Sequence, residues 1–287
     1  MNSLKGVWLP IITPFSEGKI DYQSYQKLFD YYTPKGISGL IPNGTTGECP
    51  TIEDNEFEEL LEKTVEFNQN RVPIYYGLGG NNTHKVIKQL KVVEKYNVEG
   101  ILSVSPYYSR PDQKGIFEHF KAISESTGLK IIIYNIPYRT GRNMENDTLF
   151  KLAELDNMVG VKDSCGNIIQ TMELIFNRPA NFSVLTGEDI LFYLNLALGG
   201  DGGILAAAHL ETEKFVSVKN FIDKNDFQSA LKKWKSIERF IPLLFKEPNP
   251  APIKYYLAKK GLIASDELRL PLTGISESLK HELDKYL

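Results

Sequence analysis

A lysine ends one of the apolar runs of the chain, where its amine could act as a nucleophile. Lys162 closes the run Met158–Lys162, in which it follows Met, Val, Gly and Val. An apolar surrounding disfavours the charged ammonium and lowers the pKa of a lysine. A partly neutral lysine can attack a ketone and form an imine, which then serves as an electron sink for carbanion chemistry. Taken alone, the position favours a simpler alternative, in which Lys162 caps a strand and pairs at the surface with Asp163 or Glu188.

Three further motifs carry side chains that suit imine chemistry. Thr45 and Thr46 lie in a Gly-flanked turn whose backbone N–H groups could hold a small carboxylate, although an ordinary strand-to-helix turn would look the same. Tyr134 ends the apolar run before that of the lysine and could shuttle protons, or be a half-buried strand tyrosine. Arg139 follows in a Pro-containing loop, where it could grip a carboxylate bidentately or remain a solvated cation.

Short apolar runs that alternate with amphipathic stretches supply the elements that would position these residues. The runs are Gly6–Ile12, Gly39–Pro42, Pro73–Leu78, Gly100–Val104, Lys130–Asn135, Met158–Lys162, Phe182–Thr186 and Gly203–Ala206. Strands that are apolar on both faces and alternate with helices predict a parallel sheet, and this number of units predicts a closed (β/α)8 TIM barrel. A doubly wound open sheet is the alternative. Active sites of such barrels form at the C-terminal ends of the strands, so the polar residues above are expected at one rim.

Past the last of these runs the pattern changes to helices only. The expected helices are Thr212–Asp223, Phe227–Phe240, Pro252–Lys260 and Glu277–Leu287. We therefore predict a barrel catalytic domain over residues 1–223 and a C-terminal helical segment over residues 224–287. The segment should pack on the barrel, because Glu247–Pro250 is too short for a free linker. Earlier in the chain, Thr51–Phe67 is expected to be a helix with a capping box of Thr51 and Asp54.

Composition narrows the class of function. The chain has 287 residues and a formal net charge of −3, so no basic surface predicts a nucleic acid or an anionic membrane as partner. No apolar run is long enough for a membrane-spanning helix. Cys49 and Cys165 are the only cysteines, which suits a reducing cytoplasm. The histidines at 84, 119, 209 and 281 lack ligand spacing, so we expect no metal and small-molecule substrates.

At these residues the sequence closely resembles the dihydrodipicolinate synthase branch of the pyruvate-dependent class I aldolase superfamily, which also contains N-acetylneuraminate lyase. The similarity runs almost from end to end. It rests on GTTGE at 44–48, PYYSRPDQKGIFEHF at 106–120, YNIPYRTG at 134–141, VKDSCGN at 161–167, TGED at 186–189 and KEPNPAPIKYYLAKKGL at 246–262.

The resemblance implies roles for the residues at the rim. Lys162 would form an imine with pyruvate, so that no separate cofactor is needed, and Tyr134 would be the acid and base. Thr45 and Thr46 would bind the pyruvate carboxylate. Arg139 would hold the carboxylate of the aldehyde, L-aspartate 4-semialdehyde, and the product would be 4-hydroxy-tetrahydrodipicolinate, a precursor of diaminopimelate and lysine.

The resemblance also implies an oligomer. Thr46 and Tyr108 would continue a hydroxyl relay from the acid and base, and Tyr108 or its neighbour Tyr107 would reach the site of an adjacent subunit. A homodimer or a homotetramer is therefore expected. The Ile204 backbone carbonyl would line the substrate pocket together with Gly187.

Two departures from the usual synthase sequence leave a second enzyme as an alternative, a 2-keto-3-deoxy sugar-acid aldolase that releases pyruvate with the same lysine. The Asp163–Ser164 pair resembles that branch, and Tyr138 is bulkier than the residue usual in the synthases. Arg139 favours the synthase, because sugar-acid aldolases usually carry small or apolar residues in this stretch. A non-catalytic sensor of small acids is a third possibility, against which the intact set of rim residues argues.

One position bears on regulation. In lysine-inhibited synthases an acidic residue on the helix after the third strand pairs with the ammonium of the effector, and here that position is Lys85, near Asn81. Asp54 and Phe57 occupy the flanking positions. A cation at this place would repel a cationic effector. We therefore expect lysine feedback to be weak or absent.

Overall fold

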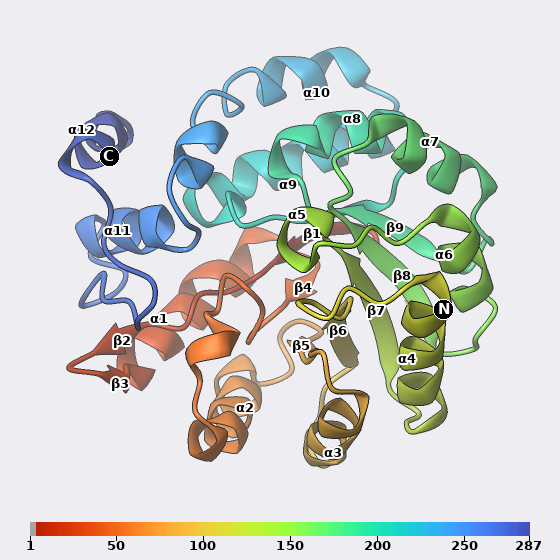
Figure 1. The fold of residues 1–287 in the computed structure, drawn as a ribbon. Helices are drawn as coiled ribbons and strands as arrows, with labels where there is room; N and C mark the ends of the chain where they lie inside the picture. The colour runs from red at the N-terminus through yellow and green to blue at the C-terminus, as the bar shows by residue number, and fades with distance from the viewer. Residues whose placement is uncertain (1–3) are drawn as a thin grey trace.

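The fold, given by a computed structural model that describes residues 4–287, is a parallel barrel surrounded by helices (Figure 1). Its strands are β1 Gly6–Leu9, β4 Gly39–Leu40, β5 Tyr75–Gly77, β6 Gly100–Val104, β7 Lys130–Asn135, β8 Met158–Asp163, β9 Ser183–Thr186 and β10 Gly202–Ile204. They pair in the order β4-β1-β10-β9-β8-β7-β6-β5, and a parallel bridge between Leu40 and Ile74 joins the two ends. The predicted barrel is confirmed, and the doubly wound open sheet is wrong.

Each strand of the barrel overlaps one of the predicted apolar runs. The runs are apolar because both faces of each strand are buried. In β7, Ile132 and Tyr134 belong to the apolar cluster inside the barrel, whereas Ile131 and Ile133 pack in the cluster beneath the helices. Trp8 is a large member of the inner cluster, and a Cβ on Gly39 would lie 2.1 Å from its ring. Side chains of this cluster therefore fill the interior of the barrel.

Most of the helices cover the outside of the barrel, whereas α5 lies over one end of it (Figure 1). The helices of the described residues are α1 Tyr22–Tyr32, α2 Asp54–Asn68, α3 Thr83–Val93, α4 Gln113–Glu125, α5 Pro137–Thr140, α6 Asn146–Leu152, α7 Ile168–Asn177, α8 Phe192–Ala197, α9 Ala208–Asp223, α10 Phe227–Trp234, α11 Ala251–Lys259 and α12 Glu277–Leu283. A short hairpin of β2 Phe15–Ser16 and β3 Lys19–Ile20 precedes α1. Both α10 and α12 end earlier than the sequence predicted. Of the described helices, none is both long and apolar enough to cross a membrane.

The predicted capping box of α2 is wrong by two residues. Thr51 belongs to a short 3-10 helix, Cys49–Thr51, and its hydroxyl donates to the Glu48 carbonyl oxygen at 3.0 Å. Glu48 has a left-handed backbone with φ 55°, and Pro50 follows, so the chain turns before the α-helix can begin. The capping box is formed instead by Glu53 and Glu56.

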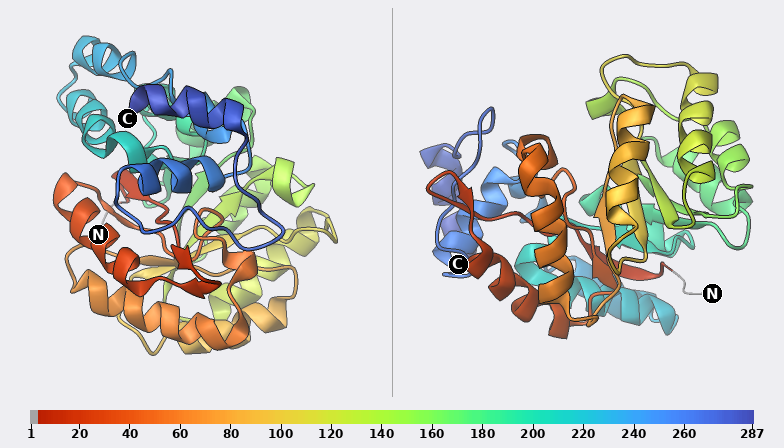
Figure 2. Two further views of the ribbon diagram at one scale, coloured as in Figure 1. Left: turned by 90° about the vertical axis from the view of Figure 1, so that its left-hand side faces the viewer. Right: turned by 90° about the horizontal axis from the view of Figure 1, so that it is seen from below.

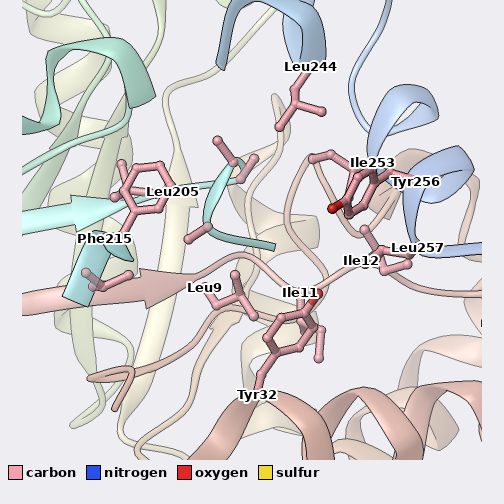
Figure 3. Packing of buried hydrophobic residues seen from close by; sticks show 14 of the residues in the cluster. Leu9, Ile11, Ile12, Tyr32, Leu205, Phe215, Leu244, Ile253, Tyr256 and Leu257 are labelled. Atoms are coloured by element: carbon pink, nitrogen blue, oxygen red, sulfur yellow. The ribbon is translucent and has the colours of Figure 1, made fainter. Parts of the chain in front are cut away.

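The C-terminal segment shares its apolar contacts with the start of the chain. Figures 1 and 2 place α11 and the loop that follows it, in blue, beside α1 and the β2–β3 hairpin, in red, and the Gly18 backbone N–H donates to Glu267 Oε1 at 2.7 Å. Figure 3 shows side chains of one buried cluster that come from these distant parts of the sequence: Leu9, Ile11, Ile12, Tyr32, Leu205, Phe215, Leu244, Ile253, Tyr256 and Leu257. Apolar burial thus joins residues 224–287 to the barrel.

Candidate active site

Lys162 and Tyr134 stand side by side at the C-terminal end of the barrel. Strands β7 and β8 pair in parallel with Tyr134 opposite Lys162, so both side chains point to the inside. The Lys162 Nζ lies 4.2 Å from the centroid of the Tyr134 ring. Both residues are buried. The surface ion pair that the sequence also allowed is therefore wrong for Lys162.

A cavity of about 480 Å³ opens above this pair. Among the predicted site residues, six line it: Thr45, Thr46, Tyr107, Tyr134, Arg139 and Lys162. Gly187, Ile204 and Tyr108 do not. The structure thus brings together an amine, a phenol, two hydroxyls and a guanidinium from four separate loops and strand ends.

Burial controls the charge of Lys162. Loss of solvent lowers the pKa of its amine to about 8, the carboxylates of Asp189 and Glu188 act in the opposite direction, and the Arg139 guanidinium adds a small further lowering. An amine with such a pKa is partly neutral near neutral pH and can attack a carbonyl carbon. Burial acts on Tyr134 too, and raises the pKa of its phenol well above the ordinary value. Tyr134 therefore holds its proton until an acceptor arrives.

Asp189 is a second buried acid beside the lysine, and the sequence reasoning missed it. Burial raises the pKa of its carboxyl to about 7, against the effects of the Ala207 N–H and of Lys162. The Ala207 N–H donates to Asp189 Oδ1 at 2.6 Å, which fixes the carboxylate in place. The signal available in the sequence was the TGED motif directly after a strand. Asp189 tunes the lysine through its field, since its oxygen is already bonded to the backbone.

Gly187 makes room for the lysine side chain. A Cβ at this position would lie 2.6 Å from Lys162 Cε and 2.3 Å from Ser164 Oγ. Any larger residue would displace the side chain that carries the amine. Gly187 therefore packs against the aliphatic part of the Lys162 side chain and does not line the cavity.

Two hydrogen bonds join the turn that contains Thr45 and Thr46 to the barrel. Thr13 Oγ1 donates to the Gly47 carbonyl oxygen at 2.8 Å, and Asn43 Nδ2 donates to the Gly77 carbonyl oxygen at 2.9 Å. The fit against β5 is close, because a Cβ on Gly77 would lie 2.1 Å from the Asn43 carbonyl oxygen. The backbone of this turn is therefore fixed relative to the strand ends.

The C-terminal segment holds the other side of the same turn. Asn249 Nδ2 donates to Thr46 Oγ1 at 3.0 Å. Lys254, on α11, forms an ion pair with Glu48, and the side chains of both are completely buried. The Arg269 N–H donates to Glu48 Oε2 at 3.2 Å. These contacts were not predicted, although KEPNPAPIK was noted as a motif.

Arg139 reaches the cavity from α5, the short helix that follows β7. Its guanidinium carbon lies 5.5 Å from the centroid of the Tyr138 ring, which is exposed. The helix ends at once because Gly141 has a left-handed backbone with φ 74°. This places an exposed positive charge in the lining of the cavity that also contains the buried amine.

Two tyrosines in the loop after β6 point to different places. Tyr107 is 40% exposed and lines the cavity of its own chain. Tyr108 is 91% exposed, has φ 68°, and does not line that cavity. As a relay member it could therefore serve only another subunit.

The cavity extends outward between α2 and α3, where Asp54, Phe57, Asn81 and Lys85 line it. Lys85 Nζ lies 3.8 Å from Asp54 Oδ1, and both side chains are largely exposed. The predicted cation thus lies in the outer wall of the cavity.

Comparison with known proteins agrees with this geometry. The model of the dihydrodipicolinate synthetase family matches residues 3–287. The chain belongs to this family. It is 62% identical over 284 residues to 4-hydroxy-tetrahydrodipicolinate synthase 2 of Clostridium acetobutylicum, with 99% of both chains covered, and 39% identical to the synthase of Karelsulcia muelleri, with 99% and 96% covered. The crystal structure of dihydrodipicolinate synthase from Thermotoga maritima superposes with a TM-score of 0.96 at 35% identity, covering 99% and 98% of the two chains.

The charge state of Lys162 can be measured directly. With selectively isotope-labelled lysine, its side-chain NMR signal should titrate with a midpoint of about 8, so that the neutral amine predominates above this pH. In Asp189→Asn the midpoint should fall, because a carboxylate that favours the ammonium has been removed. A midpoint near the ordinary lysine value of about 10.4 would contradict the burial argument.

Proposed function

We propose that the protein condenses pyruvate with L-aspartate 4-semialdehyde to form 4-hydroxy-tetrahydrodipicolinate. One observation carries the proposal: a buried lysine with a lowered pKa stands beside a tyrosine at the floor of a cavity, with an arginine at its mouth. Membership of the dihydrodipicolinate synthetase family and the names of its relatives give the substrates.

The first half of the reaction uses pyruvate and the floor of the cavity. The Lys162 amine adds to the keto carbon of pyruvate, and loss of water gives the imine, so that no separate cofactor is required. The backbone N–H groups and hydroxyls of Thr45 and Thr46 bind the carboxylate. The methyl group then loses a proton and the imine becomes an enamine. Tyr134 is suited to pass protons at these steps, because its phenol lies beside the amine and stays protonated at rest.

The second half brings in the aldehyde at the mouth. The enamine carbon attacks the aldehyde carbon, whose oxygen takes a proton and becomes the hydroxyl group. The amino group of the semialdehyde then attacks the imine carbon, which releases the Lys162 amine and closes the ring. Arg139 holds the carboxylate of the aldehyde during these steps, because its planar fork matches two carboxylate oxygens.

Assembly completes the proton path in this proposal. Tyr108 of a second copy enters the site and continues the relay from Tyr134, in a homodimer built around the loop with Tyr107 and Tyr108. Two observations support this arrangement: Tyr108 is 91% exposed, and it does not line the cavity of its own chain. Further association to a tetramer has a candidate surface on α7, where a row of large apolar side chains is exposed: Ile168, Ile169, Met172 and Phe176.

The sugar-acid aldolase alternative loses the support of Asp163, one of the residues on which it rested. The Asp163 carboxylate does not line the cavity and accepts a hydrogen bond from Thr171 Oγ1 at 2.6 Å. The relatives named above are synthases. We also infer a cytoplasmic enzyme, in keeping with the free thiols of Cys49 and Cys165.

Arg139→Ala tests the proposed function at the second substrate. Loss of a bidentate ion pair should lower kcat/KM for L-aspartate 4-semialdehyde by about 10- to 100-fold. The KM for pyruvate should change little, provided that the coupled assay is run above the Lys162 pKa of about 8. Arg142→Ala is the matched control, because this exposed arginine in the same loop does not line the cavity. Faster cleavage of 2-keto-3-deoxygluconate than condensation of the semialdehyde by the wild type would overturn the proposal.

Lysine feedback gives a second test. We expect millimolar L-lysine to leave the steady-state rate nearly unchanged, because the Lys85 ammonium in the outer wall would repel the ammonium of the effector. Lys85→Glu reverses this charge and should make the enzyme more sensitive to lysine. Strong inhibition of the wild type by lysine would contradict the predicted repulsion between Lys85 and the effector.

A further inference from the structure

The hydroxyl of Thr46 makes its hydrogen bond to a residue far away in the sequence. Asn249 Nδ2 lies 3.0 Å from Thr46 Oγ1, and 203 residues separate the two along the chain. Both residues are buried, with exposed fractions of 3% and 9%. Thr46 lines the cavity, whereas Asn249 lies behind it, at the start of the segment that leads into α11.

The direction of this hydrogen bond determines what Thr46 can do. A hydroxyl has one proton and two lone pairs, and an amide nitrogen can only donate. The Thr46 oxygen is therefore the acceptor toward Asn249, and its own proton remains available for donation to another group. Since Thr46 lines the cavity, that proton can be donated to an anionic group of a ligand, for which a carboxylate is a strong acceptor.

The position of Asn249 is fixed by the contacts around it. Lys254, in the first turn of α11, forms the buried ion pair with Glu48, two residues beyond Thr46. Lys254 Nζ also donates to the Glu267 carbonyl oxygen at 2.8 Å and lies 4.1 Å from the centroid of the Phe15 ring. The turn and the start of α11 are thus tied together at two points, so the amide cannot move independently of the hydroxyl.

We propose that Asn249 is a positioning residue for pyruvate: its amide N–H occupies one lone pair of the Thr46 hydroxyl, which leaves the hydroxyl proton directed at the pyruvate carboxylate. The inference rests on the proposed function for the identity of the ligand. It gives the C-terminal segment a part in substrate binding, although none of its residues lines the cavity. A purely structural Asn249 would stabilise the turn without regard to what stands at position 46.

A double-mutant cycle separates these two roles. Asn249→Ala should raise the dissociation constant of pyruvate, measured by calorimetry, and its KM by about 10-fold, which corresponds to the loss of one charge-assisted hydrogen bond. Thr46→Val, which keeps the shape but has no hydroxyl, should show a similar loss. In the Thr46→Val background, Asn249→Ala should add almost nothing.

The control background is Thr46→Ser, which keeps the hydroxyl, and there Asn249→Ala should again weaken pyruvate binding by about 10-fold. If Asn249→Ala weakens binding equally in the Val and Ser backgrounds, the residue is merely structural and the proposal fails. Should Asn249→Ala not fold, as judged by thermal unfolding, Asn249→Asp is used in the same cycle. Its carboxylate has the same shape and would accept the Thr46 proton, so pyruvate binding should fall at least as far.

The calorimetric readout keeps the inference separate from the proposed function. Wild-type enzyme that binds pyruvate but fails to convert L-aspartate 4-semialdehyde would overturn the proposed function alone. The cycle would still decide whether Asn249 acts through Thr46, because it requires only pyruvate and no aldehyde.

Discussion

The burial of one amine at the end of β8 is the constraint on which the rest of the site depends. A lysine ammonium in a closed barrel is costly, and the chain meets that cost by letting the amine lose its proton more readily. Lys162 has no carboxylate bonded to it that would hold the charge, since Asp163 bonds to Thr171 and Asp189 to the Ala207 N–H. The same burial that disfavours the ammonium therefore favours a neutral amine, the form that the proposed mechanism requires.

The surroundings keep this arrangement rigid. Gly187 lets the backbone after β9 lie against the stem of the lysine, and Gly77 lets the turn with Thr45 and Thr46 lie against β5. The opposite side of that turn is fixed by the buried ion pair of Glu48 and Lys254. A buried pair of this kind adds little net stability but is costly to break, so it defines one geometry. Binding groups held in this way need not reorganise when substrate arrives.

Sequence reasoning succeeded where a local pattern reports the structure. Strands buried on both faces are apolar throughout, which is why runs such as Met158–Lys162 coincide with barrel strands. Active sites of such barrels form at the C-terminal ends of the strands, and this rule predicted that Lys162, Tyr134 and Arg139 lie at one rim. It failed where the decisive partner is distant. The bond from Asn249 to Thr46 spans 203 residues and leaves no local signal. The capping box was misplaced because Thr51 belongs to a short 3-10 helix, Cys49–Thr51, so that α2 begins after Glu53.

The predicted hydroxyl relay also depends on structure that the local sequence does not report. Tyr108 is recognisable as a motif residue, but whether it serves its own site depends on where its loop points, and the structure directs it outward. The acid Asp189 was overlooked because a carboxylate after a strand usually faces solvent, whereas the Ala207 N–H draws this one inward. For both residues the sequence shows the residue type, but it does not show which way the side chain points.

The central claim, that the buried amine of Lys162 is the nucleophile toward pyruvate, has a direct test. The enzyme is incubated with pyruvate, reduced with borohydride and digested, and the peptides are mapped by mass. The account predicts one reduced pyruvate adduct, on the peptide that contains Lys162, and none in Lys162→Arg. An adduct on another lysine, or no adduct in an enzyme that turns over, would contradict it.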